Sequence, residues 1–169
     1  MLNSLDNLNT EEKDLVMNAL PIITVMIAAA DGSVDESETN WANKLTDIRS
    51  YSHEEDLQSY YEKVGENFAQ QVRMMVKDLP ANTKEAVPAL AATLAGMNDV
   101  LPKLPPTISG PFLKSMKSFA KHIARASGGF LKIASISKEE QALIDLPMIT
   151  FIPPVIVEEE VEEDTATDD

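Results

Sequence analysis

The 169-residue sequence contains no cysteine and only two histidines, His53 and His122. Without cysteine the chain has no disulfide bond, no thiolate nucleophile and no cysteine-ligated zinc or iron–sulfur centre. Neither histidine has an acidic or hydroxyl partner at a catalytic spacing, so we expect each at the surface or in a structural hydrogen bond. A glycine-rich phosphate loop, a serine-centred elbow and a dinucleotide fingerprint are also absent. These absences predict a protein that is not an enzyme.

The sequence also lacks a basic secretory leader and a long apolar run. Its first charged residues are the acids Asp6, Glu11 and Glu12, and no small-residue cleavage site follows the first apolar run. That run, residues 15–30, is the longest in the chain. Its 16 residues include an asparagine, a proline and a threonine, and it is short for about 30 Å of hydrocarbon. We therefore expect a buried core helix in a cytoplasmic protein.

Charge is distributed unevenly along the chain. The net charge is −14, from 28 acids and 14 bases. Residues 155–169 carry eight acids and no base, which leaves 20 acids against 14 bases in residues 1–154. A charge run with almost no apolar residues cannot bury a core. The sequence therefore predicts one folded domain over residues 1–154 and a disordered acidic tail over residues 155–169.

Helix signals dominate the folded part. Asn9 and Glu12 have the spacing of a capping box before a helix that ends near Asp31, and the same spacing recurs twice further on. No stretch has the alternation of a strand, and Pro153-Pro154 excludes a central strand near the C-terminus. The sequence predicts an all-α bundle of about six or seven helices that ends in an extended segment.

Two local predictions concern the second half of the chain. Prolines around Ser109-Gly110-Pro111 predict a loop that ends at a helix from Phe112 to Ser127. A short helix is expected from Gln141 to Leu146.

Four carboxylates, Asp31, Asp35, Glu36 and Glu38, lie within eight residues after the apolar run. They are explained either as helix punctuation or as oxygen ligands for a hard divalent cation such as Ca²⁺ or Mg²⁺. The loop is not an EF-hand, because a loop that starts at Asp31 has Glu36 at its sixth position and Ala42 at its twelfth.

The run Ala30-Asp31-Gly32-Ser33-Val34, with Glu38 four residues later, resembles the A-D-G-x-[IV]-x-x-x-E turn of the TerB-like tellurite-resistance family. The resemblance implies an all-helical TerB-like fold in which Asp31, Asp35 and Glu38 bind a divalent metal. It also implies a scaffold role in stress-response complexes near the membrane rather than catalysis.

Family members usually have a second, related turn. Here residues 123–128 echo residues 27–32, and Glu140 or Glu139 matches the glutamate of that turn. The resemblance therefore adds Glu140 to the predicted metal ligands. The chain departs from the family at Ser127, where the aspartate is missing, and in a longer loop that follows.

Seven bases and no acid lie between Asp99 and Glu139. Four of them are spaced three and four residues apart, which places them on one helix face: Lys114, Lys117, Lys121 and Arg125. We predict that these residues bind a partner, and the alternative is a solvated helix face. A third interpretation is that the acidic tail covers them.

The predicted function is that of a non-catalytic TerB-like protein that binds a divalent cation and contacts a protein partner. Peripheral contact with the inner face of the membrane is a second kind of partner. The net charge argues against nucleic acid. The alternative is a helical adaptor that binds no metal and whose acidic turn is only a cap. A hydrolase with paired carboxylates is a more distant alternative.

Overall fold

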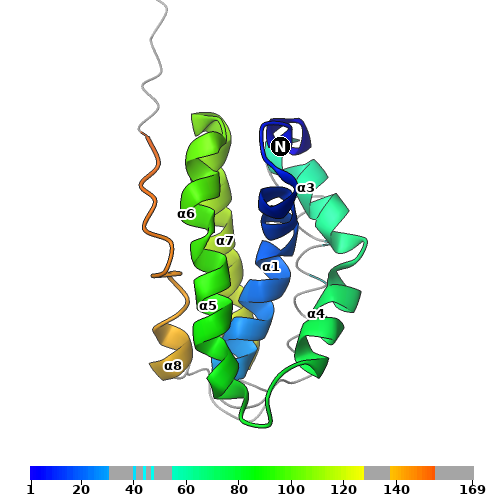
Figure 1. The fold of residues 1–169 in the computed structure, drawn as a ribbon, viewed down its shortest axis with the longest axis vertical. Coiled ribbons are helices and arrows are strands. Elements are labelled where there is room, and N and C mark those ends of the chain that lie inside the picture. The colour runs from blue at the N-terminus through cyan, green and yellow to red at the C-terminus, as the bar shows by residue number, and fades with distance from the viewer. Residues whose placement is uncertain (31–39, 41–43, 45–46, 48–54, 128–137, 155–169) are drawn as a thin grey trace, which may run out of the picture.

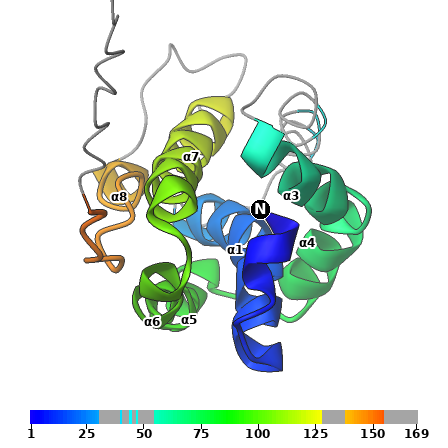
Figure 2. The same cartoon turned by 90° about the horizontal axis from the view of Figure 1, so that it is seen from above.

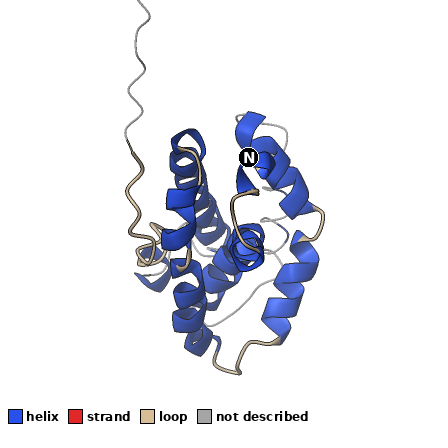
Figure 3. Ribbon diagram, turned by 45° about the horizontal axis from the view of Figure 1, so that its top comes forward, coloured by secondary structure: helices blue, strands red, loops and turns tan. Residues whose placement is uncertain are grey.

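The computed structural model describes residues 1–30, 40, 44, 47, 55–127 and 138–154. Every regular element in these ranges is a helix, and none of the described residues forms a strand (Figure 3). The all-α prediction is therefore confirmed. The acidic turn, most of the helix predicted after it and residues 155–169 lie outside the described residues.

Among the described residues, seven α-helices have bounds, and they keep the labels of Figure 1. Their bounds are α1 Thr10–Ala30, α3 Glu55–Gly65, α4 Phe68–Lys77, α5 Val87–Ala95, α6 Met97–Val100, α7 Pro106–Ser127 and α8 Lys138–Gln141. Short 3₁₀ helices cover Leu2–Leu5, Thr83–Ala86 and Leu101–Lys103.

Helix α1 forms the centre of the bundle. It contacts each of the helices α3 to α8, and every residue from Ala19 to Ala30 is buried. Its N-terminus has the predicted capping box: the Glu12 amide donates to Asn9 Oδ1 at 2.9 Å, and the Asn9 amide donates to Glu12 Oε2 at 3.0 Å. By length and composition alone α1 could also cross a membrane, but 72% of its apolar window is buried inside this structure. The predicted core helix is confirmed.

The other helices lie around α1. Helices α3 and α4 lie on one side of it, whereas α5, α6 and α7 lie on the other (Figures 1 and 2). Tyr60 of α3 donates a hydrogen bond from its hydroxyl to the carbonyl of Val16 in α1, at 3.0 Å. Its ring meets Phe112 of α7 edge to face, with ring centroids 4.9 Å apart. Aromatic contacts thus tie α1, α3 and α7 together.

Helix α7 begins six residues earlier than predicted, at Pro106 rather than at Phe112. The first position of a helix suits proline, because its missing N–H would have no helical partner there. The amides of Ile108 and Ser109 both donate to the carbonyl of Pro105, at 2.8 and 2.9 Å. Ile108 and Ser109 are buried. The predicted loop is therefore wrong where it overlaps α7: burial favours helix over the local turn signal.

The short helix predicted over residues 141–146 is also wrong. Helix α8 occupies Lys138–Gln141, and single turns follow it. Leu146 ends these turns with a φ of 50°, in the left-handed region. It precedes a proline, which disfavours helical backbone, and its side chain is fully buried. The packing of Leu146 thus fixes a sharp turn where local spacing indicated helix.

The extended segment after this turn is held by one side chain, that of Asn98 in α6. Its amide nitrogen donates to the carbonyls of Ala95, at 2.8 Å, and Met148, at 2.9 Å. Its amide oxygen accepts the backbone N–H groups of Thr150, at 2.7 Å, and Phe151, at 3.0 Å. Residues 148–151 are therefore anchored to α6. Residues 149–154 of the predicted extended segment form no helix or strand, and the rest of it lies outside the described residues.

Candidate functional site

The structure describes only one of the four predicted metal ligands, Glu140. Asp31, Asp35 and Glu38 lie outside the described residues. In the part of the chain that the structure describes, no three His, Cys, Asp or Glu side chains gather in a group that could hold a metal ion. Glu140 is described and is 3% exposed, in a helix that packs against α1. A buried carboxylate needs a hydrogen bond, a cation or a metal to offset its desolvation.

The predicted basic residues lie on the outer side of α7. The inner side consists of buried apolar residues: Phe112, Leu113, Met116, Phe119, Ala120, Ile123 and Ala124. On the other side, Lys114 and Arg125 are exposed, and Lys117 and Lys121 are half-buried. Helix spacing alone separates the two sets, because residues three and four apart share a face.

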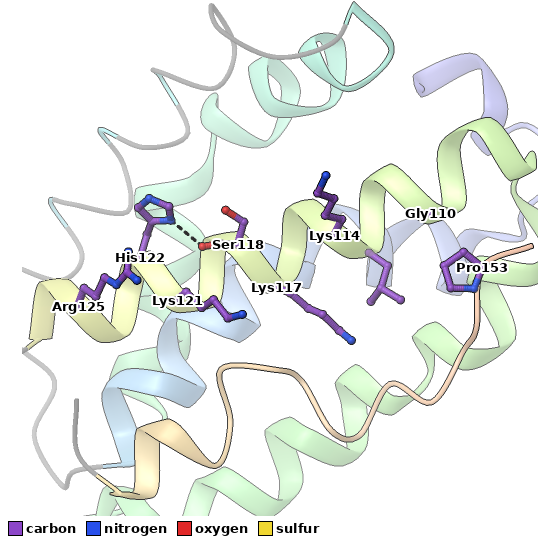
Figure 4. A pocket seen from close by; sticks show the side chains of 9 residues that line it. Gly110, Lys114, Lys117, Ser118, Lys121, His122, Arg125 and Pro153 are labelled. Atoms are coloured by element: carbon purple, nitrogen blue, oxygen red, sulfur yellow. Dashed lines mark hydrogen bonds between the residues drawn. The ribbon is translucent and has the colours of Figure 1, made fainter. Parts of the chain in front are cut away.

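The four bases line one groove, which we call the basic groove. It has a volume of about 540 Å³ and is broadly open to solvent. Figure 4 shows the side chains that line it. Its lining residues are Gly110, Leu113, Lys114, Lys117, Ser118, Lys121, His122, Arg125 and Pro153. All but Pro153 belong to α7. The structure therefore brings all four predicted partner-binding residues into one cavity.

One of the four bases forms an ion pair. Lys121 Nζ lies 3.1 Å from Asp145 Oδ1, which comes from the turns after α8. Within the described ranges no carboxylate pairs with Lys114, Lys117 or Arg125. Three of the four bases thus have no carboxylate partner among the described residues.

His122 is oriented by its own helix. Its ring nitrogen Nδ1 donates to the carbonyl oxygen of Ser118, at 2.7 Å (Figure 4). A carbonyl accepts only a proton-bearing nitrogen, so this bond fixes the proton of a neutral ring on Nδ1. The expectation of a structural hydrogen bond is confirmed for His122, whereas His53 lies outside the described residues.

Pro153 forms the wall at one end of the groove. It packs on Gly110, where an added Cβ would lie only 3.3 Å from the Cβ of Pro153. Glycine at this position thus allows the C-terminal segment to approach α7 closely. Because Asn98 anchors residues 148–151 next to this contact, the wall has a fixed position.

Sequence reasoning missed five lining residues: Gly110, Leu113, Ser118, His122 and Pro153. Ser118 and His122 could have been found, since they follow Lys114 at intervals of four residues. Pro153 could not, because it reaches the groove through a tertiary contact with Gly110, 43 residues away in the sequence.

Comparison of the chain with family models, with curated proteins and with solved structures gives no match. The resemblance to the TerB-like family stays an expectation based on residues 27–38, and the function has to be argued from the geometry.

Proposed function

We propose that this protein is a non-catalytic helical adaptor that binds an extended acidic segment of a protein partner in the basic groove. The observation that carries the proposal is that Lys114, Lys117, Lys121 and Arg125 line one cavity on α7, beside His122. Positive charge in a concave site attracts carboxylates and orients them.

The spacing of the bases fits an extended peptide. At about 1.5 Å per helical residue, neighbouring bases are about 4.5 to 6 Å apart along the axis of α7. Side chains on one face of an extended chain repeat every 6 to 7 Å or so. A segment with acids at alternate positions can therefore place successive carboxylates near successive bases. The groove spans about 16 Å from Lys114 to Arg125, which corresponds to about five residues of such a segment.

An acidic protein segment suits the groove better than nucleic acid or lipid. The chain as a whole has a net charge of −14, which repels a highly charged phosphate polymer or an anionic membrane more strongly at long range than a short acidic segment. A single peptide strand can lie along the outer face of α7 and end at the contact between Pro153 and Gly110, whereas a flat bilayer surface cannot fit against that contact. We propose a cytoplasmic location for this activity.

The test is the binding of a fluorescent twelve-residue glutamate-rich peptide at low salt, measured by anisotropy. A Lys114→Gln/Lys117→Gln double variant should bind the peptide at least about fivefold more weakly, because each lost charge contact contributes roughly 0.5 to 1 kcal/mol. The matched control is Arg73→Gln/Lys77→Gln, which removes the same charge from exposed positions of α4.

An equal loss of peptide affinity in the two double variants would contradict the proposal, because it would show that the peptide responds to the net charge of the protein and not to the basic groove. Tighter binding to phosphatidylserine vesicles than to the peptide would replace the protein partner with a membrane.

A second candidate function is divalent metal binding at the turn of Asp31, Asp35 and Glu38, with Glu140 as a fourth ligand and a stress-related scaffold role, as the TerB-like resemblance implies. The burial of the Glu140 carboxylate against α1 favours it. The test is thermal unfolding in EDTA and then in millimolar Ca²⁺ or Mg²⁺. A cation at about 100 times its Kd should stabilise the fold by roughly 2.7 kcal/mol.

Asp31→Asn and Glu140→Gln should each reduce that shift, whereas Glu139→Gln is the matched control on the exposed side of α8. A shift that persists in both variants would contradict this ligand set. The absence of a shift in the parent chain would leave the acidic turn as a helix cap.

A further inference from the structure

We propose that the acidic segment of this same chain, residues 155–169, occupies the basic groove and competes with the partner for it. The inference rests on the proposed function, since it assigns a regulator to the same groove. Three features carry it: the place where the segment begins, its reach and its charge pattern.

The segment begins at the groove. Asn98 anchors residues 148–151 through three backbone groups, and Ile149 is buried. Pro153, two residues after Phe151, packs on Gly110 and lines the groove. Residue 155 therefore follows directly from the groove wall.

The segment is long enough to lie along the whole groove. From Gly110 to Arg125 the axis of α7 rises about 22 Å. An extended chain advances about 3.3 Å per residue, so the first acid, Glu158, lies within about 17 Å of Pro153, and the 15 residues span up to about 50 Å. A turn after Pro154 leaves more than enough chain to reach Arg125.

Charge complementarity identifies this segment as the occupant. Five of the six positions from 158 to 163 are glutamate, and the segment has no base. Lys114, Lys117 and Arg125 pair with no carboxylate among the described residues. Asp145, from the same C-terminal part of the chain, already contacts Lys121. One acid close to the C-terminal segment thus already contacts a base of the groove.

Tethering makes even a weak contact effective. A ligand attached a few residues from its site has an effective concentration in the millimolar range. A partner in solution must compete with the tethered segment. The apparent affinity of the partner therefore falls by a factor that grows with the ratio of this effective concentration to the Kd of the segment for the groove. The acidic segment would then set a threshold that only a partner with a longer or more acidic segment passes.

The first test uses a variant of the full chain in which the five glutamates of the acidic segment, at positions 158, 159, 160, 162 and 163, are changed to glutamine. A fluorescent peptide with the sequence of residues 155–169 is titrated into this variant and into the parent chain at low salt. We expect the variant to bind the peptide about threefold or more tightly than the parent, and the advantage should shrink as salt screens the charges.

The outcomes separate the two proposals. Equal binding by parent and variant, together with weaker binding when Lys114→Gln/Lys117→Gln is added, overturns the inference and leaves the groove function intact. Binding that does not respond to Lys114→Gln/Lys117→Gln in either background overturns both.

A second test observes the contact within one molecule. Because the chain has no cysteine, Ala166→Cys gives a single site for a nitroxide spin label. The label should broaden the backbone amide signals of Ser118 and His122 in α7 more than that of Val72 in α4. Lys114→Gln/Lys117→Gln should remove this difference. Equal broadening of α4 and α7 in the parent chain would overturn the inference whatever the peptide titration gives.

Discussion

Helices α1 and α7 have nearly the same length, 21 and 22 residues, and each contains an internal proline. From Ala19 onward α1 is buried on every side, whereas α7 buries one face and presents Lys114 and Arg125 to solvent on the other. Length and helix signals are therefore alike, and the placement of charge makes the difference. The helix with no charged residue in its second half forms the core, and the helix with charges every three or four residues forms the candidate binding surface.

The largest expected effect comes from truncating buried side chains in the two helices. Ile23→Ala in α1 should lower the free energy of unfolding by about 2 to 5 kcal/mol, and Phe119→Ala in α7 by about 3 to 5 kcal/mol, because each leaves a cavity in the core. Lys117→Ala, on the outer face of α7, should change it by less than about 0.5 kcal/mol. Urea unfolding measures all three.

The contrast between the buried and the outer face of α7 would be contradicted if Lys117→Ala lowered the free energy of unfolding as much as Phe119→Ala does. Such a result would mean that the outer face of α7 is packed against another part of the chain and is not a binding surface.

Local signals predicted the parts of the molecule that depend on local interactions. The capping box of Asn9 and Glu12 lies within one helical turn, and each base in the row on α7 is three or four residues from the next, so both were predicted from spacing. The start of α7 was mispredicted, because burial of Ile108 and Ser109 outweighs the turn signal around them. The Pro153 wall was not predicted at all, since it depends on where Asn98 lies in the folded chain.

A medium effect is expected from Asn98→Ala, which tests whether the outer face of α7 depends on the C-terminal segment while α1 does not. The variant loses the hydrogen bonds to Met148, Thr150 and Phe151 and should lower the free energy of unfolding by about 1 to 3 kcal/mol. Amide chemical shifts should change along Gly110 and its neighbours and stay constant in α1.

Asn98→Asp is the matched control, because it keeps the acceptor for Thr150 and Phe151 and loses only the donated bonds. Its cost should be smaller than that of Asn98→Ala. Shift changes spread evenly over α1 and α7 in Asn98→Ala would show that this side chain supports the whole bundle rather than the groove wall.

The smallest effect concerns the first turn of α1, which contains the acids Glu11 and Glu12, whereas the first turn of α7 contains no acid. Lys103 forms a hydrogen-bonded ion pair with Glu12 and, together with the Asn9 amide, holds the pKa of the Glu12 carboxyl below its ordinary value. A depressed pKa stabilises the fold above the unfolded pKa, and this contribution is lost as the pH falls through the folded pKa.

Lys103→Gln should raise the pKa of Glu12 toward its ordinary value, measured by NMR titration of its side-chain carbon. Lys63→Gln, which removes a distant base paired with Glu66, should leave that titration unchanged. An unaltered pKa in Lys103→Gln would assign the depression to the capping box alone.

The amide group of Asn98 also has a kinetic consequence. The backbone N–H groups of Thr150 and Phe151 share one acceptor atom, so neither can exchange its proton with solvent through rotation of that side chain without exposing the other. Their hydrogen-exchange rates should rise and fall together as conditions change. We therefore expect residues 148–151 to detach as one cooperative unit, a local opening separate from the unfolding of the bundle, so that the groove loses its wall in a single step rather than by gradual fraying.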